Sequence, residues 1–319
     1  MPGAALAQPQ SMRPATPENS AALLEGVVIS PRQGVAYVMR SGGIDAVNLA
    51  TGKLRWRSDK AAKPLALVGE RLIAQVAGSR KGNTLDLAVL DARNGASRDS
   101  IRIPLPEGVV ASVVDTPAGS FRVRTNSTAS ELLVSWEATG VGVAAQGYVP
   151  AVDEGQAPVA GMEAVTGAAV LDMTAQKLTI KAEPSVRLAE SASIVRSAIE
   201  ELSSPAVAGI EGRQFLSADG RHVLVTDTVE AGSSLYRHRW TMYERASGAR
   251  LGSLPALVSA TPFVVIGNTL YHSVPAHTVR KDGKFVENPT SLRAVNLKTG
   301  VEAWKMAVLE TSFRGPFPP

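Results

Sequence analysis

The chain has 319 residues, of which 45% are hydrophobic and 19% charged, a balance typical of a folded globular protein rather than a disordered chain. It contains no cysteine, which excludes disulfides, thiolate metal sites and cysteine nucleophiles. The formal net charge is +4 and aromatic residues make up only 5%, so no nucleic-acid-binding surface is indicated, and no apolar run is long enough to form a transmembrane helix.

Residues 1–20 are predicted to precede the folded domain, which we place at residues 21–319. Ala5-Leu6-Ala7 matches the small-residue pattern of a signal-peptide cleavage site, with Gln8 as the new N-terminus. The following stretch is rich in Pro, Gln and Ser, as expected for an unstructured lead-in. We therefore expect a periplasmic or secreted protein; the alternative is a flexible tail without a role in export.

A twelve-residue pattern occurs near both ends of the predicted domain. Residues 46–57 and 294–305 share seven identical positions at an offset of 248, in the form Ala-Val-Asn-Leu-x-Thr-Gly-x-x-x-Trp. Weaker copies end near positions 95, 176 and 248. The repeat residues that we expect to be structural are Gly52, Trp56, Gly95, Gly248, Gly300 and Trp304.

Each copy predicts a β-hairpin, because glycine supplies the positive φ that a tight turn requires and the preceding polar residue can cap the turn. Further strands are predicted before these hairpins by their apolar, β-branched composition, at residues 34–39, 71–76, 221–226 and 263–266. Two strands followed by a hairpin of two more make a four-stranded blade. Blades repeating every 40–50 residues or so indicate an all-β propeller.

The turn positions 52, 95, 176, 248 and 300 are separated by 43, 81, 72 and 52 residues. We interpret these intervals as five blades with two insertions. The first insertion is expected near 141–166, a stretch rich in Gly, Ala and Pro. The alternative is six blades, with Gly140 at an additional turn.

The second insertion is predicted to be a helix at residues 187–203, with Ser185 as a possible N-cap and Pro205 after its end. Its apolar residues recur at helical spacing, at Leu188, Ala192, Val195, Ile199 and Leu202. We expect this stripe to pack on the propeller or to bind a partner. Val195 and Ile199 are therefore candidate partner-binding residues.

Residues 236–245 form the most polar and aromatic of the predicted strands. Arg237 and Arg239 share one face and Trp240 and Met242 the other, because side chains alternate along a strand. The two arginines are candidates for binding an acidic partner. The favoured interpretation is that they are solvated above a buried apolar face.

His272 and His277 are five residues apart, an odd spacing that favours ordinary surface histidines over a metal site. Residues 280–284, Arg-Lys-Asp-Gly-Lys, predict a basic hairpin tip, interpreted as a surface turn. The nucleophile-elbow, zinc-protease and phosphate-loop motifs are absent from the sequence. We therefore assign no catalytic residue and no metal ligand.

The pattern at residues 46–56 and 294–304 resembles the repeat of quinoprotein-like β-propellers. The resemblance spans about residues 22–310 and implies that the repeat tryptophans pack between neighbouring blades. The family includes pyrroloquinoline-quinone alcohol dehydrogenases and non-catalytic members, among them a lipoprotein of the bacterial outer-membrane assembly machine. The dehydrogenases have more blades, a vicinal disulfide beside the quinone, and a calcium site of Glu, Asn and Asp. None of these can be assigned here, so no cofactor is predicted.

These observations favour a non-enzymatic, exported propeller that acts as a monomeric scaffold and binds a protein partner. The alternative function is a quinone-dependent or carbohydrate-acting enzyme with its site at the central channel. An enzyme of that kind needs convergent carboxylates, histidines or a metal in the channel, whereas a scaffold does not.

Overall fold

The structure of the chain, a computed structural model, describes residues 21–77, 83–113, 119–127, 131–139, 164–172, 177–181, 200–217, 220–230, 237–257 and 263–309. These residues form antiparallel β-sheets, and none of them is in a helix. The prediction of an all-β fold is therefore confirmed.

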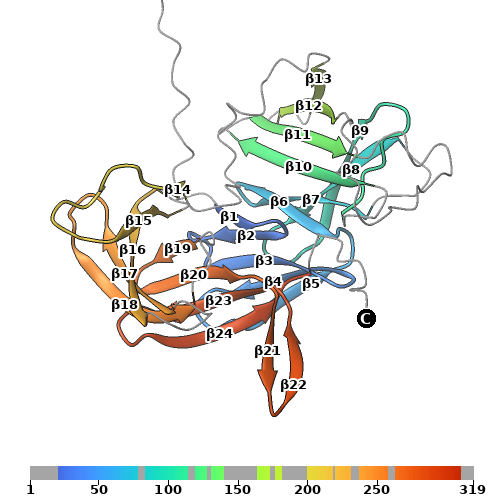
Figure 1. Cartoon of the computed structure of the whole chain (residues 1–319). Coiled ribbons are helices and arrows are strands. Elements are labelled where there is room, and N and C mark those ends of the chain that lie inside the picture. The colour runs from blue at the N-terminus through green and yellow to red at the C-terminus, as the bar shows by residue number, and fades with distance from the viewer. Residues whose placement is uncertain are drawn as a thin grey trace, which may run out of the picture.

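The strands follow one another in chain order within each sheet, apart from one inserted hairpin (Figure 1). The first sheet comprises β1 (Ala21–Leu24), β2 (Val27–Ser30), β3 (Val35–Arg40), β4 (Gly43–Asn48) and β5 (Leu54–Ser58). The second comprises β6 (Lys63–Val68), β7 (Arg71–Gln75), β8 (Thr84–Asp91) and β9 (Ser97–Pro104). The third comprises β10 (Ser120–Ser127), β11 (Glu131–Thr139), β12 (Val165–Asp172) and β13 (Lys177–Lys181).

The fourth sheet comprises β14 (Glu200–Glu201), β15 (Arg213–Leu216), β16 (His222–Glu230), β17 (Arg237–Glu244) and β18 (Arg250–Leu257). The fifth comprises β19 (Phe263–Ile266), β20 (Thr269–Val274), β23 (Ser291–Asn296) and β24 (Val301–Ala307). Between β20 and β23 the chain forms a separate two-stranded hairpin, β21 (His277–Lys281) and β22 (Lys284–Asn288).

The repeated turn has the same local structure in the first and fifth sheets. The Asn48 side-chain oxygen accepts hydrogen bonds from the N–H groups of residues 50 and 51, at 2.9 and 3.1 Å. Asn296 does the same for residues 298 and 299, at 2.9 and 3.3 Å. Gly52 and Gly300 close the two turns with φ of 66° and 70°, values that glycine adopts without steric cost. The Asn-x-x-x-Gly spacing therefore encodes the turn locally.

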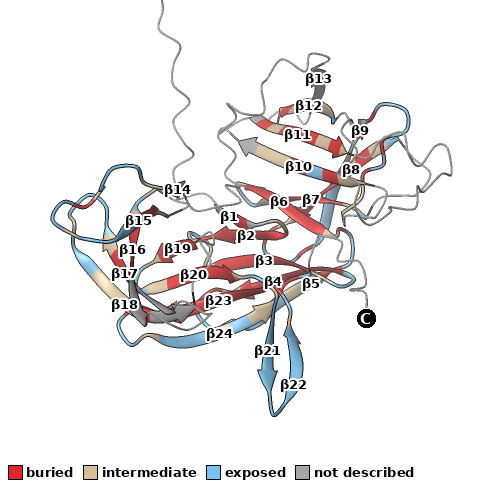
Figure 2. Ribbon diagram, in the orientation of Figure 1, coloured by how far each residue is buried: buried red, intermediate tan, exposed pale blue. Residues whose placement is uncertain are grey.

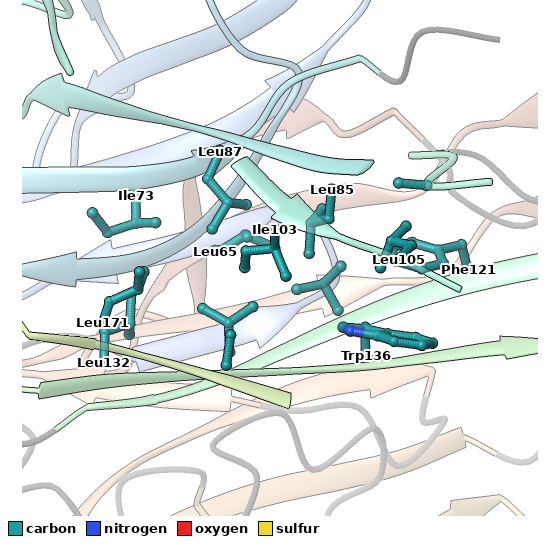
Figure 3. Close-up of a cluster of buried hydrophobic side chains, with 14 of the residues drawn as sticks. Leu65, Ile73, Leu85, Leu87, Ile103, Leu105, Phe121, Leu132, Trp136 and Leu171 are labelled. Carbon is teal, nitrogen blue, oxygen red and sulfur yellow. The ribbon is translucent and has the colours of Figure 1, made fainter. Parts of the chain in front are cut away.

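The hydrophobic core is divided into several clusters, most of them between two sheets, and Figure 2 shows the buried strands that contribute to them. One buried cluster joins the first sheet to the second, and another joins the first sheet to the fifth. Two more join the second sheet to the third and the fourth to the fifth. In the cluster of Figure 3, Leu65, Ile73 and Leu87 of the second sheet face Leu132 and Trp136 of the third.

The structure describes only the C-terminal ends of the two predicted insertions. Most of the predicted helix at 187–203 lies outside the described residues, but Glu200–Glu201 is a strand that pairs with Phe215 and Leu216. The helical periodicity is overridden at this end by sheet hydrogen bonding. Residues 141–163 of the other insertion also lie outside the described residues, whereas Val165 already belongs to β12, which pairs directly with β11.

Candidate interaction surface

The hairpin β21–β22, residues 277–288, is called the arm. It projects from the fifth sheet, away from the body of the molecule (Figure 1). Every residue of its two strands is exposed except Asn288, which is half-buried. Figure 2 shows the arm as a continuous exposed segment that projects beyond the buried strands of the sheets.

A comparison of the first and fifth sheets identifies the arm as an addition to the repeat. In the first sheet, β3 and β4 are joined by the two-residue turn Ser41-Gly42. The equivalent strands β20 and β23 pair directly with each other, with Val274 opposite Ser291, and the arm connects them. The hydrogen bonds between β20 and β23 involve no residue of the arm, so we expect the fifth sheet to form without it.

The register of the arm determines what each of its faces presents. Val279 lies opposite Val286, and Lys281 lies opposite Lys284. Directly opposed residues share a face, so one face carries this valine pair and this lysine pair. Arg280 lies opposite Phe285 and occupies the other face. Phe285 is 77% exposed, and Val279 and Val286 are 38% and 40% exposed, so apolar groups meet solvent on both faces.

Both ends of the arm are locally fixed. At the tip, Asp282 and Gly283 have φ of 50° and 78°, the left-handed conformations of the Asp-Gly turn that suits two-residue hairpins. At the base, the Ala276 N–H donates to the Thr290 hydroxyl at 3.1 Å, and the Val308 N–H donates to the Thr290 carbonyl at 2.8 Å. The arm is therefore a preformed element attached to a buried strand end.

The tip of the arm is basic. Arg280, Lys281 and Lys284 lie within two residues of the turn, and Asp282 is the acidic residue between them. Within the described part of the chain, these three basic side chains form no ion pair. The arm thus offers cations at its end, with Phe285 one pair behind the lysines and the valine pair two pairs behind them.

The repeat residues make contacts between sheets. A Cβ added to Gly52 would lie 2.7 Å from Trp304, and one added to Gly95 would lie 2.6 Å from Trp56. Trp304 Nε1 donates to the Leu49 carbonyl at 2.8 Å. The corresponding bond from Trp56 Nε1, to the Ala92 carbonyl, is 3.1 Å. Each tryptophan is half-buried and lies against the glycine turn of the following sheet, and for Trp304 that sheet is the first.

A tyrosine accompanies each tryptophan. Tyr37 lies 5.7 Å from Trp56, and Tyr271 lies 6.0 Å from Trp304, between ring centroids. Each tyrosine hydroxyl donates to the same carbonyl as its tryptophan, at 3.1 Å. Gly248 also closes a turn, with φ of 68°, but its nearest described neighbour is Val207 rather than a tryptophan. The tyrosine–tryptophan pairs therefore hold neighbouring sheets together, whereas no such contact is made at Gly248 among the described residues.

The other predicted partner-binding residues belong to different segments of the chain from the arm. Val195 and Ile199 lie outside the described residues. Arg237 and Arg239 lie on β17, where their backbones pair with Leu257 and Pro255. On the same strand Trp240 and Met242 are fully buried, as the alternation predicts.

His272 and His277, the two histidines considered as a metal pair, lie in different surroundings. His277 is exposed at the base of the arm, and its Nδ1 lies 2.9 Å from the Pro275 carbonyl. His272 is only 4% exposed and lies against Trp240, with ring centroids 5.5 Å apart. The expectation that both are surface histidines is therefore wrong for His272. Burial, together with the positive charge of Arg293, lowers its pKa to about 4, so this imidazole is neutral at pH 7.

Polar groups are also buried near the first strands of the sheets. Lys63 is buried at the start of β6, and its Nζ lies 3.1 Å from Glu25 Oε2. The Gln75 amide is buried opposite Lys63 and donates to the Ser112 carbonyl at 3.3 Å. Among the described residues, no group of three or more His, Asp or Glu side chains is placed to hold a metal ion. The Lys63 ammonium and the Gln75 amide N–H thus have structural partners, whereas the Gln75 Oε1 is buried without a hydrogen-bond partner among the described residues.

The basic tip of the arm is predictable from residues 280–284, whereas its length and its apolar faces were not predicted. The length of the arm is reflected in the spacing of the repeated segments. The strands that begin at Val35 and Thr269 are offset by 234 residues, whereas the repeats at Ala46 and Ala294 are offset by 248. The difference of 14 residues marks an insertion between β20 and β23.

No protein-family model and no curated protein matches this chain. Among solved structures, an uncharacterized protein from Listeria monocytogenes EGD-e is similar at 9% identity with a TM-score of 0.29, over 94% of this chain and 85% of its own. Quinohemoprotein alcohol dehydrogenase ADHIIG from Pseudomonas putida HK5 is similar at 13% identity with a TM-score of 0.25, over 92% of this chain and 60% of its own. TolB from Acinetobacter baumannii is similar at 11% identity with a TM-score of 0.26, over 86% of this chain and 51% of its own. Likeness at this level assigns no function to the chain.

No helix in the described residues is long and apolar enough to cross a membrane.

Proposed function

We propose that this chain is a five-bladed β-propeller that serves as a binding scaffold and holds a protein partner through its arm. The packing of the fifth sheet against the first supports a ring. Trp304 lies on the Gly52 turn, the Leu309 N–H donates to the Met39 carbonyl at 3.1 Å, and Arg40 binds the Ala307 carbonyl. β6, the first strand of the second sheet, contacts β2 of the first sheet and β10, the first strand of the third, which also fits neighbouring blades.

The arm is the observation that carries the binding role. It is an insertion that the fifth sheet does not use, and it holds Phe285, Val279 and Val286 in solvent. Exposed apolar side chains gathered on a projecting element are characteristic of interaction sites. A preformed hairpin also loses little conformational entropy when it binds.

A photo-crosslinking experiment tests the proposal. A p-benzoylphenylalanine is placed at Phe285 of the full chain in the cells that make it, and a matched one at Leu54, which is 53% exposed on β5. We expect a discrete crosslinked protein from position 285 and none from position 54. Equal products from both positions, or none from 285, would contradict the proposal.

A competition experiment identifies the arm as the determinant. In the shortened-arm chain, residues 278–281 and 284–287 are deleted, so that Asp282-Gly283 joins the paired residues His277 and Asn288. Excess unlabelled full chain is expected to abolish the crosslink, and excess shortened-arm chain is expected to leave it. Equal competition by both chains would place the binding site elsewhere.

We also propose that the protein acts outside the cytoplasm, on the basis of Ala5-Leu6-Ala7. N-terminal sequencing of the protein from its own cell is expected to begin at Gln8. A Met1 retained on cytosolic protein would contradict this.

A further inference from the structure

We infer that the tip of the arm binds carboxylate groups on the floor of a partner protein's cleft, whose apolar walls cover both faces of the arm. This inference rests on the proposed function, because it requires the arm to be the binding element. It adds the chemistry of the partner.

The lysine pair at the tip points to an anionic partner. Lys281 and Lys284 lie directly opposite each other in the register, on the same face. Like charges in directly opposed positions destabilise a hairpin. A carboxylate placed between the two ammonium groups would replace that repulsion with charge-assisted hydrogen bonds. Arg280 adds a third cation on the opposite face, and a guanidinium can bind a carboxylate through two hydrogen bonds.

The apolar residues indicate a cleft rather than a flat surface. The Val279–Val286 pair faces one side and Phe285 the other, so a flat partner would leave one of these groups in water. A cleft covers both sides at once. Because Phe285 lies one pair and the valine pair two pairs behind the lysines, these apolar residues would meet the walls while the lysines meet the floor.

A lipid bilayer fits this arrangement less well. Insertion into a bilayer places apolar side chains deepest and basic side chains at the headgroups. On the arm the order is reversed, because Lys281, Asp282, Gly283 and Lys284 lead and Phe285 follows. The geometry therefore favours a protein with acidic residues at depth.

The test uses the full chain carrying p-benzoylphenylalanine at position 285. The double variant Lys281→Glu/Lys284→Glu reverses the charge of the tip. The matched control, Lys53→Glu/Lys298→Glu, makes the same change at two exposed lysines in the glycine turns at the other end of the sheets. We expect the crosslink yield to fall about tenfold in the tip variant and to stay unchanged in the control, because charge complementarity is lost only at the tip.

The crosslinked partner provides a second readout. We expect its labelled peptide to adjoin Asp or Glu residues, and replacing these by Lys is expected to restore the yield with the charge-reversed arm. A yield unaffected by Lys281→Glu/Lys284→Glu would overturn the inference on charge while leaving the arm as a binding element. Absence of any crosslink from position 285 in the chain with an unaltered tip would contradict the proposed function itself.

Vesicle sedimentation distinguishes a lipid surface from a protein partner. The purified chain is mixed with vesicles of phosphatidylcholine containing phosphatidylglycerol and sedimented. We expect no more binding by the full chain than by the shortened-arm chain. Arm-dependent sedimentation with the vesicles would overturn the inference in favour of an anionic lipid surface.

Discussion

Trp304 and its neighbours show how single side chains hold the first and last sheets together. The indole lies on Gly52 and donates to the Leu49 carbonyl, while Tyr271 donates to the same oxygen. We expect Trp304→Ala to lower the free energy of unfolding by about 3 kcal/mol, through lost packing and a lost hydrogen bond. Trp304→Phe keeps a ring over Gly52 and is expected to cost about 1 kcal/mol. Urea denaturation measures both, and an alanine variant as stable as the wild type would show that this contact is dispensable.

His272 makes the stability of the fold sensitive to acid. Its pKa is about 4 in the folded chain against 6.5 for an unperturbed histidine, because burial disfavours the charged ring. The unfolded chain therefore binds a proton that the folded chain excludes. Above pH 6.5 His272 is neutral in both states and the stability is unaffected. As the pH falls from 6.5 towards 4, the free energy of unfolding decreases by roughly 3 kcal/mol because of this residue.

The test compares wild type with His272→Leu in urea at pH 7 and pH 4. We expect the variant to lose roughly 3 kcal/mol less than the wild type over this interval. His277→Gln, at an exposed position, is the control and should follow the wild-type profile. Parallel profiles for wild type and His272→Leu would contradict the expectation.

We expect the arm and the fifth sheet to be separable elements, because the pairing of β20 with β23 involves no residue of the arm. We expect the shortened-arm chain to melt within about 2 °C of the full chain, since it loses only exposed side chains. Circular dichroism on heating measures this. A drop of more than about 5 °C would show that the arm contributes to the folded core.

The whole molecule depends on contacts between residues far apart in the sequence. Leu23, Val27 and Ile29 of the first sheet share a buried cluster with Val264 and Leu292 of the fifth. A chain ending at residue 257 would expose these side chains, and each buried aliphatic side chain is worth about 1.5–3 kcal/mol. We expect this chain to be insoluble or unfolded, whereas the shortened-arm chain remains folded. A soluble truncated chain with native-like near-ultraviolet circular dichroism would show that the first four sheets fold without the fifth.

Local sequence determined the strands and the turns of this protein. The strands predicted at 34–39, 71–76, 221–226 and 263–266 correspond to β3, β7, β16 and β19. Alternation and β-branched composition act over a few residues, and the Asn-x-x-x-Gly turn closes through its own hydrogen bonds, so both can be recognised from the sequence alone. The same is true of the hairpin at Asp282-Gly283.

Tertiary structure decided the features that depend on distant residues. Glu200–Glu201 joined a sheet because β15 offered a strand edge, against the helical periodicity of the preceding residues. His272 became buried because Trp240, from another sheet, covers it. The arm's exposure follows from the direct pairing of β20 with β23, which leaves the intervening residues outside the sheet. Each of these outcomes is set by what packs against a segment, and a periodic pattern in one segment carries no information about its neighbours in space.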